Sequence, residues 1–215
     1  MDYTHYISTD LLTFEVLQEI IFYHKSIVLS ENAKTNIVKC REYLDAKMAS
    51  HPEPIYGINT GFGSLYNVKI SNENLSKLQE NLVKSHACGT GEEVPNEIVK
   101  IMLLLKIQSL SYGHSGIQLE TVQRLVDFYN NDILPVIFTQ GSLGASGDLA
   151  PLAHLSLPLL GEGEVWFEGE KINSDEVLNR FGWKPLVFKV QRRFGVVKRN
   201  TVYECLRFLY RNESK

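Results

Sequence analysis

Apolar residues recur at intervals of three and four along most of this chain, and this spacing limits the fold more than any other feature. Residues at i, i+3, i+4 and i+7 lie on one face of an α-helix, so each run predicts a helix with one buried side. The runs are Phe14, Leu17 and Ile21; Ala33, Ile37, Cys40 and Leu44; Leu75, Leu78 and Leu82; Ile98, Ile101, Met102 and Leu105; and Val122, Leu125, Val126 and Tyr129. Ser30 suits the N-cap of the second helix. The sequence therefore predicts a mainly α fold.

A few short strands are expected beside these helices. In the segment EVWFEGEKI, two β-prone runs flank Gly169, and a glycine suits the tight turn of a hairpin. The run that begins at Ile98 is more apolar than the others, so we expect its helix to be buried.

Composition excludes several functional classes. The net charge of −3 over 215 residues gives no general attraction to nucleic acid or to an anionic membrane. No apolar run approaches the roughly 20 residues that span a bilayer, and the start MDYTHYISTD does not resemble a signal peptide. Cys40, Cys88 and Cys205 form neither a metal-binding pair nor a disulfide framework. We expect a cytoplasmic protein with reduced thiols and no metal, nucleic-acid or membrane partner.

The segment YGINTGFGSLYN, which begins at Tyr56, has three glycines in seven residues. Such a loop lets the backbone approach a ligand closely, with Tyr56 and Asn59 as its polar side chains. A surface turn with a buried tyrosine is the alternative. The glycine spacing matches neither of the common phosphate-binding motifs, which disfavours a nucleotide site.

The segment GSLGASGDLAPLAH places a serine between two glycine-rich stretches, just before an apolar helix. A nucleophilic serine of the G-x-S-x-G type needs glycine on both sides, but Asp148 stands two residues after Ser146. His154 lies in the same predicted helix and reads as an ordinary polar position. A nucleophilic serine needs a base within hydrogen-bond reach, and the sequence indicates none. A serine hydrolase therefore remains only an alternative interpretation.

Backbone chemistry is the second interpretation of this segment. The Gly147 nitrogen can attack the Ala145 carbonyl because neither small residue hinders the approach. Loss of water, including the Ser146 hydroxyl, then gives an imidazolone whose exocyclic methylene is an electrophile. The helix that follows, with Pro151 in its first turn, would bring its positive end close to this group.

Three segments of the chain resemble the aromatic amino-acid ammonia-lyase family. GSLGASGDLAPLAH resembles its signature, YGINTGFG its tyrosine loop, and NLVKSHACGTG a third active-site segment. The similarity is collinear from about Tyr6 to Lys189. It implies the N-terminal part of a mainly helical, homotetrameric enzyme whose active sites are assembled from several subunits.

The resemblance also implies the prosthetic group 4-methylidene-imidazol-5-one (MIO). Ala145, Ser146 and Gly147 would form it autocatalytically, with no added organic cofactor. MIO would activate an aromatic amino acid through either its amino group or its ring, and the sequence does not choose between them.

The resemblance assigns three side chains to the substrate. Tyr56 would take the β-proton, which requires a pKa below the usual value of about 10. His86 would contact the aromatic side chain, and Asn59 is a further candidate for substrate binding. The SHACGTG context matches the histidine-specific members, so L-histidine is the predicted substrate, with urocanate and ammonia as products. Tyrosine, and a purely structural His86, remain alternatives. His114 is interpreted as structural.

The resemblance ends at residue 189, and residues 190–215 form an aberrant tail. Codons for the segment from Gln191 to Phe208 can be chosen so that reading one base later encodes KEGLALLNGTQFMSAYG, which is like the family's continuation. We infer a frameshift, from a mutation or a sequencing error. The tail lacks the family's NGT asparagine, a downstream arginine and long tetramer helices, so we expect this chain to be inactive. A non-catalytic fragment is the alternative function.

Overall fold

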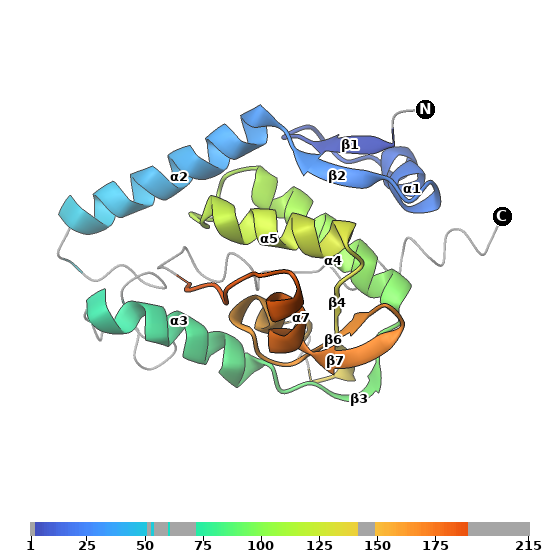
Figure 1. Cartoon of the computed structure of the whole chain (residues 1–215). Helices are drawn as coiled ribbons and strands as arrows, with labels where there is room; N and C mark the ends of the chain where they lie inside the picture. The colour runs from blue at the N-terminus through green and yellow to red at the C-terminus, as the bar shows by residue number, and fades with distance from the viewer. Residues whose placement is uncertain (1–2, 51–52, 54–59, 61–71, 142–148, 189–215) are drawn as a thin grey trace.

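The chain is mainly α-helical, as its apolar spacing predicts. The computed structural model describes residues 3–50, 53, 60, 72–141 and 149–188 (Figure 1). Its helices are α1 (Phe14–Phe22), α2 (Glu31–Ser50), α3 (Asn72–His86), α4 (Asn96–Ser111), α5 (Leu119–Asn130), α6 (Leu149–Ser156), the 3₁₀ helix η2 (Leu157–Leu160) and α7 (Ser174–Arg180). Within these ranges no helix combines the length and apolar character needed to cross a membrane.

Among the described residues, short strands form three small sheets beside the helices. They are β1 (Thr4–Ile7), β2 (Ser26–Leu29), β3 (Thr90–Glu93), β4 (Leu134–Pro135), β5 (Phe138–Gln140), β6 (Glu164–Phe167) and β7 (Glu170–Asn173). β1 pairs with β2 in parallel, β3 pairs with β5 antiparallel, and β4, β6 and β7 form an antiparallel sheet in that order.

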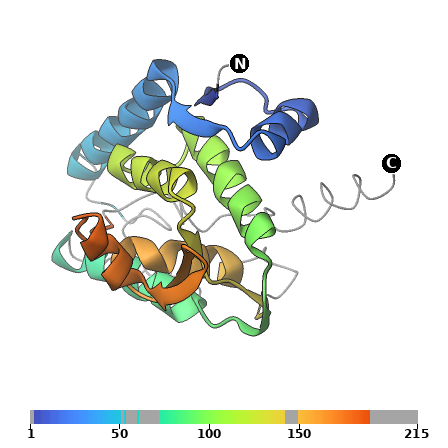
Figure 2. The ribbon, with the colours of Figure 1, turned by 45° about the vertical axis from the view of Figure 1, so that its right-hand side comes forward.

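Helix α4 lies at the centre of the described fold. Helices α2 and α5 and strands β1 and β4 all pack against it (Figures 1 and 2). The predicted burial of this helix is confirmed: Ile101, Met102, Leu103, Leu104 and Ile107 are each fully buried.

The predicted helices are confirmed, although some of them bury other residues than the spacing indicates. The Ser30 hydroxyl accepts a hydrogen bond from the Ala33 amide at 3.2 Å, so Ser30 caps α2 as expected. In α1 the buried side chains are Leu17 and Ile20, whereas Phe14 is 49% exposed. The buried stripe of α1 is therefore rotated from the one that the spacing indicates.

The predicted hairpin is formed by β6 and β7. Its two turn residues, Glu168 and Gly169, have φ values of 53° and 82°, the left-handed conformation that two-residue hairpin turns prefer. Glu93 of β3 accepts hydrogen bonds from the Trp166 indole and the Lys171 ammonium, each at 2.9 Å. These bonds attach the hairpin to the neighbouring sheet.

The side-chain amide of Asn130 hydrogen-bonds strand β2 to the end of α5. The Asn130 side chain accepts a hydrogen bond from the Ile27 amide at 2.8 Å and donates one to the Ile27 carbonyl at 2.9 Å. It thus makes the two bonds that a neighbouring strand would make. Ile27 is fully buried, so its backbone groups have little access to water as a replacement.

We predict that Asn130→Ala lowers the free energy of unfolding by about 1–3 kcal/mol, because two buried backbone groups lose their partners. Asn131→Ala is the matched control. Its amide donates one exposed hydrogen bond, to the Asp127 carbonyl at 2.8 Å, so its loss should cost less than about 1 kcal/mol. Urea unfolding followed by circular dichroism measures both. Equal effects at the two positions would contradict this role for Asn130.

Candidate functional site

Most of the residues predicted for the site lie outside the described residues. These are Tyr56, Asn59, Ala145, Ser146 and Gly147, and the tail of residues 190–215 also lies there. His86 is within the described part of the chain. So is Thr60, which follows Asn59 in the glycine-rich loop and is fully buried.

His86 is the last residue of α3, and its ring is bonded back onto the helix. Its Nδ1 lies 2.7 Å from the Leu82 carbonyl oxygen. A carbonyl can only accept, so Nδ1 carries the proton that makes this bond. In the neutral ring the lone pair is then on Nε2, an assignment that follows from the hydrogen-bond network. Nε2 is therefore the hydrogen-bond acceptor of the neutral His86 ring.

Helix α3 is fixed by packing on one side and by ion pairs on another. It packs against α6 and η2 (Figure 2). Its Val83 side chain is buried. The Lys84 ammonium lies 2.9 Å from Glu80 of the same helix and 2.7 Å from Glu162, in the turn after η2. These exposed ion pairs raise the pKa of Lys84 through its hydrogen bonds to Glu162 and Glu80. They add little stability but favour one position of the helix end.

The residue that precedes the segment 142–148 lies against the chain that follows α3. Gly141, just before the segment, has φ of +119°. A Cβ there would lie 2.8 Å from the Gly89 Cα and 3.1 Å from the Cys88 carbonyl oxygen. Helix α6 begins at Leu149, directly after the segment, and its N-terminal amides carry partial positive charge. This arrangement suits a polar group formed within the segment.

A second histidine, which the sequence suggests is an ordinary polar residue, is buried at this junction. The side chain of His154 on α6 accepts a hydrogen bond from the Gly89 amide at 2.9 Å, and the residue is 9% exposed. Burial lowers the pKa of His154 below its usual value, so the ring is neutral at neutral pH. Its partner is 65 residues away, so no local sequence pattern identifies this contact.

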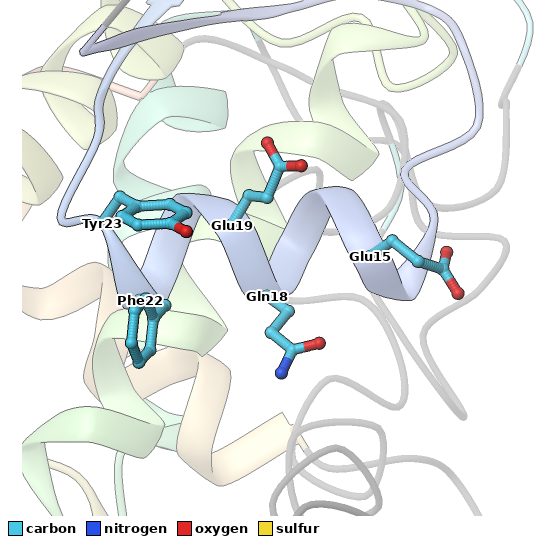
Figure 3. A pocket seen from close by; sticks show the side chains of 5 residues that line it. All are labelled: Glu15, Gln18, Glu19, Phe22 and Tyr23. Atoms are coloured by element: carbon cyan, nitrogen blue, oxygen red, sulfur yellow. The ribbon is translucent and has the colours of Figure 1, made fainter. Parts of the chain in front are cut away.

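A surface hollow lies elsewhere, along α1 (Figure 3). It is lined by Glu15, Gln18, Glu19, Phe22 and Tyr23. None of the predicted site residues lines it. Among the described residues, no group of three or more histidine, cysteine or acidic side chains is arranged to hold a metal ion.

Comparison with known proteins places these features in a family. The profile of the family "Aromatic amino acid lyase" matches residues 12–205. A curated histidine ammonia-lyase from Legionella pneumophila (strain Corby) is 48% identical over 181 residues, which are 84% of this chain and 36% of the relative. The chain thus spans little more than a third of that relative's length.

Solved structures resemble the described fold closely. Histidine ammonia-lyase from Trypanosoma cruzi has a TM-score of 0.84 at 31% identity, over 96% of this chain and 39% of that one. Ergothionase from Treponema denticola, an ergothioneine-degrading enzyme, has a TM-score of 0.90 at 27% identity, over 98% and 42%. The family match covers most of the sequence and agrees with the fold. The chain therefore belongs to the aromatic amino acid lyase family.

Proposed function

We propose that this chain is part of a histidine ammonia-lyase, which converts L-histidine to urocanate and ammonia without oxidation. The observation that carries the proposal is the orientation and tautomer of the His86 ring, in a chain that belongs to the aromatic amino acid lyase family. Its ring is anchored through Nδ1 and directs hydrogen-bond acceptance to Nε2. The sequence similarity to curated histidine ammonia-lyases supports the choice of histidine.

The proposed electrophile is MIO, formed from Ala145, Ser146 and Gly147. When present, MIO supplies an electrophilic methylene that activates the amino acid for loss of ammonia. The positive end of α6 and the close approach of Gly141 to Gly89 are consistent with such a group.

The proposed substrate contacts have two roles, which are recognition of the imidazole ring and removal of the β-proton. His86 Nε2 would accept a hydrogen bond from the imidazole N–H of L-histidine, which orients the ring. Tyr56, on the glycine-rich loop, would remove the β-proton, and Asn59 would contact the substrate from the same loop. A base within hydrogen-bond reach of a weakly acidic proton is required for elimination of ammonia.

The assembly that we propose is a cytoplasmic homotetramer. The family's active sites combine residues of several subunits, so the remaining two thirds of the relatives' length would supply part of each site. We also propose that residues 1–189 form the lyase region and that residues 190–215 arise from a change of reading frame. Resequencing the gene across the codons for Lys189 to Gln191 tests this last point directly.

The first test is a chimaera of residues 1–189 followed by the C-terminal remainder of the Legionella pneumophila relative. We expect it to release ammonia from L-histidine and to form urocanate, measured by its ultraviolet absorbance. Ser146→Ala in this chimaera should lower the turnover at least about a hundredfold, because the electrophile is lost. Ser142→Ala, in the same segment, is the matched control and should retain activity. Wild-type turnover in the Ser146 variant would refute the MIO proposal.

The second test concerns substrate choice. In the same chimaera, His86→Leu should lower kcat/KM for L-histidine about 10- to 100-fold, because a hydrogen bond to the imidazole is lost. Its effect on L-phenylalanine, which has no ring N–H, should be much smaller. Asn81→Ala, at an exposed position of the same helix, is the control. Equal losses for both substrates would argue against recognition by His86, and a preference for L-tyrosine would replace only the substrate assignment.

The third test concerns the 215-residue chain by itself. We expect it to produce no urocanate from L-histidine and to lack the near-ultraviolet absorbance of MIO. The cyclisation needs the backbone of residues 145–147 to be pressed into a tight turn by surrounding structure. Conversion of histidine to urocanate by this polypeptide would show that the further length of the relatives is dispensable.

A further inference from the structure

His154 is one of ten polar or charged residues that are buried in the described part of the chain, and the proposed chemistry does not use it. The Gly89 amide donates a hydrogen bond to its Nε2 at 2.9 Å. Since an amide can only donate, Nε2 carries the lone pair and the neutral ring has its proton on Nδ1. A buried histidine with a fixed tautomer holds its partner in one place.

The contact between His154 and Gly89 leaves no room for a side chain at residue 89. A Cβ there would lie 2.8 Å from Nε2 of His154 and 3.2 Å from Cβ of Phe138. The Phe138 ring meets the imidazole edge to face, with 5.2 Å between centroids. On the other side, a Cβ at Gly141 would overlap the Gly89 backbone. The imidazole, the backbone of residue 89 and Gly141 therefore form one closely packed junction.

This junction lies two residues beyond Ala87, where α3 has just ended. The Ala87 amide still bonds to the Val83 carbonyl at 3.0 Å, and the His86 ring bonds to the Leu82 carbonyl one turn back. Both bonds require the last turn of α3 to stay helical. Helix ends fray unless the chain beyond them is fixed, and the hydrogen bond from Gly89 to His154 fixes it here.

We propose that His154 is a positioning residue of the ammonia-lyase site. By accepting the Gly89 amide proton it holds the chain after α3 against Gly141, and this keeps the His86 ring bonded to Leu82 with Nε2 as its acceptor. The role of His154 in the lyase reaction rests on the proposed function. Its positioning of the Gly89 backbone is a property of the chain alone. His154 acts through the backbone of Gly89 and not on the substrate.

The test uses nuclear magnetic resonance of the 215-residue chain labelled with ¹⁵N, so it does not depend on enzymatic activity. In the unmodified chain we expect a through-hydrogen-bond coupling between the Gly89 nitrogen and Nε2 of His154. The His86 ring should show the signals of the tautomer protonated at Nδ1. Absence of the coupling would overturn the proposal without any variant.

Variants then separate positioning from simple core packing. His154→Phe keeps a ring but removes the acceptor, so Gly89 amide exchange should accelerate about tenfold and the His86 ring signals should shift. His154→Gln restores an acceptor and should return both toward the unmodified values. His5→Phe, which removes a histidine from β1, is the control and should leave both unchanged. If His154→Phe accelerates Gly89 amide exchange but leaves the His86 ring signals as they are in the control, His154 has only a packing role.

The same variants in the chimaera connect this role to the reaction. His154→Phe should lower kcat/KM for L-histidine more than for L-phenylalanine, because the recognition by His86 is impaired. Equal losses would overturn the link to recognition. An inactive parent chimaera would instead count against the proposed function, and the resonance measurements would still decide the positioning role.

Discussion

The burial of α4 on almost every side is the constraint on which the described structure depends. A helix with apolar residues all round cannot rest on a surface, so α2, α5, β1 and β4 surround it. Its polar side chains must then find partners inside the protein. Gln108 donates to the carbonyls of Ser8 and Asp10 at 2.9 and 3.2 Å, and Ser111 donates to that of Ser8 at 3.0 Å. These bonds fix the N-terminal segment to the core.

The features that local sequence predicts well are those whose stability is local. The Ser30 cap and the Gly169 turn depend on residues within a few positions, and both are confirmed. Local sequence does not predict strands β1 and β2, because each has four residues and becomes stable only by pairing with the other. The apolar spacing also gives the wrong buried face for α1: packing buries Ile20, whereas the spacing alone favours Phe14.

The candidate site shows the same division between local and distant causes. The resemblance identified His86, but its tautomer depends on the Leu82 carbonyl that its ring meets. His154 could not be recognised as a buried acceptor, because Gly89 is 65 residues away in sequence. The roles of Tyr56, Asn59 and Ser146 stay predictions from the resemblance, since they depend on tertiary contacts that no spacing rule specifies.

The two histidines of this site use one tautomer for different purposes. In His154 the acceptor nitrogen is bonded to a backbone amide, and burial keeps the ring neutral, so its hydrogen bond is settled before any ligand arrives. In His86 it is Nδ1 that is bonded to the backbone, which assigns acceptance to Nε2 on a half-buried ring. Only two residues separate His86 from Gly89. Under the proposed function, a rigid contact beside the proposed recognition residue would lower the entropy lost when a ligand binds, because the ring is already oriented. In that proposal the scaffold would contribute to recognition without touching the ligand.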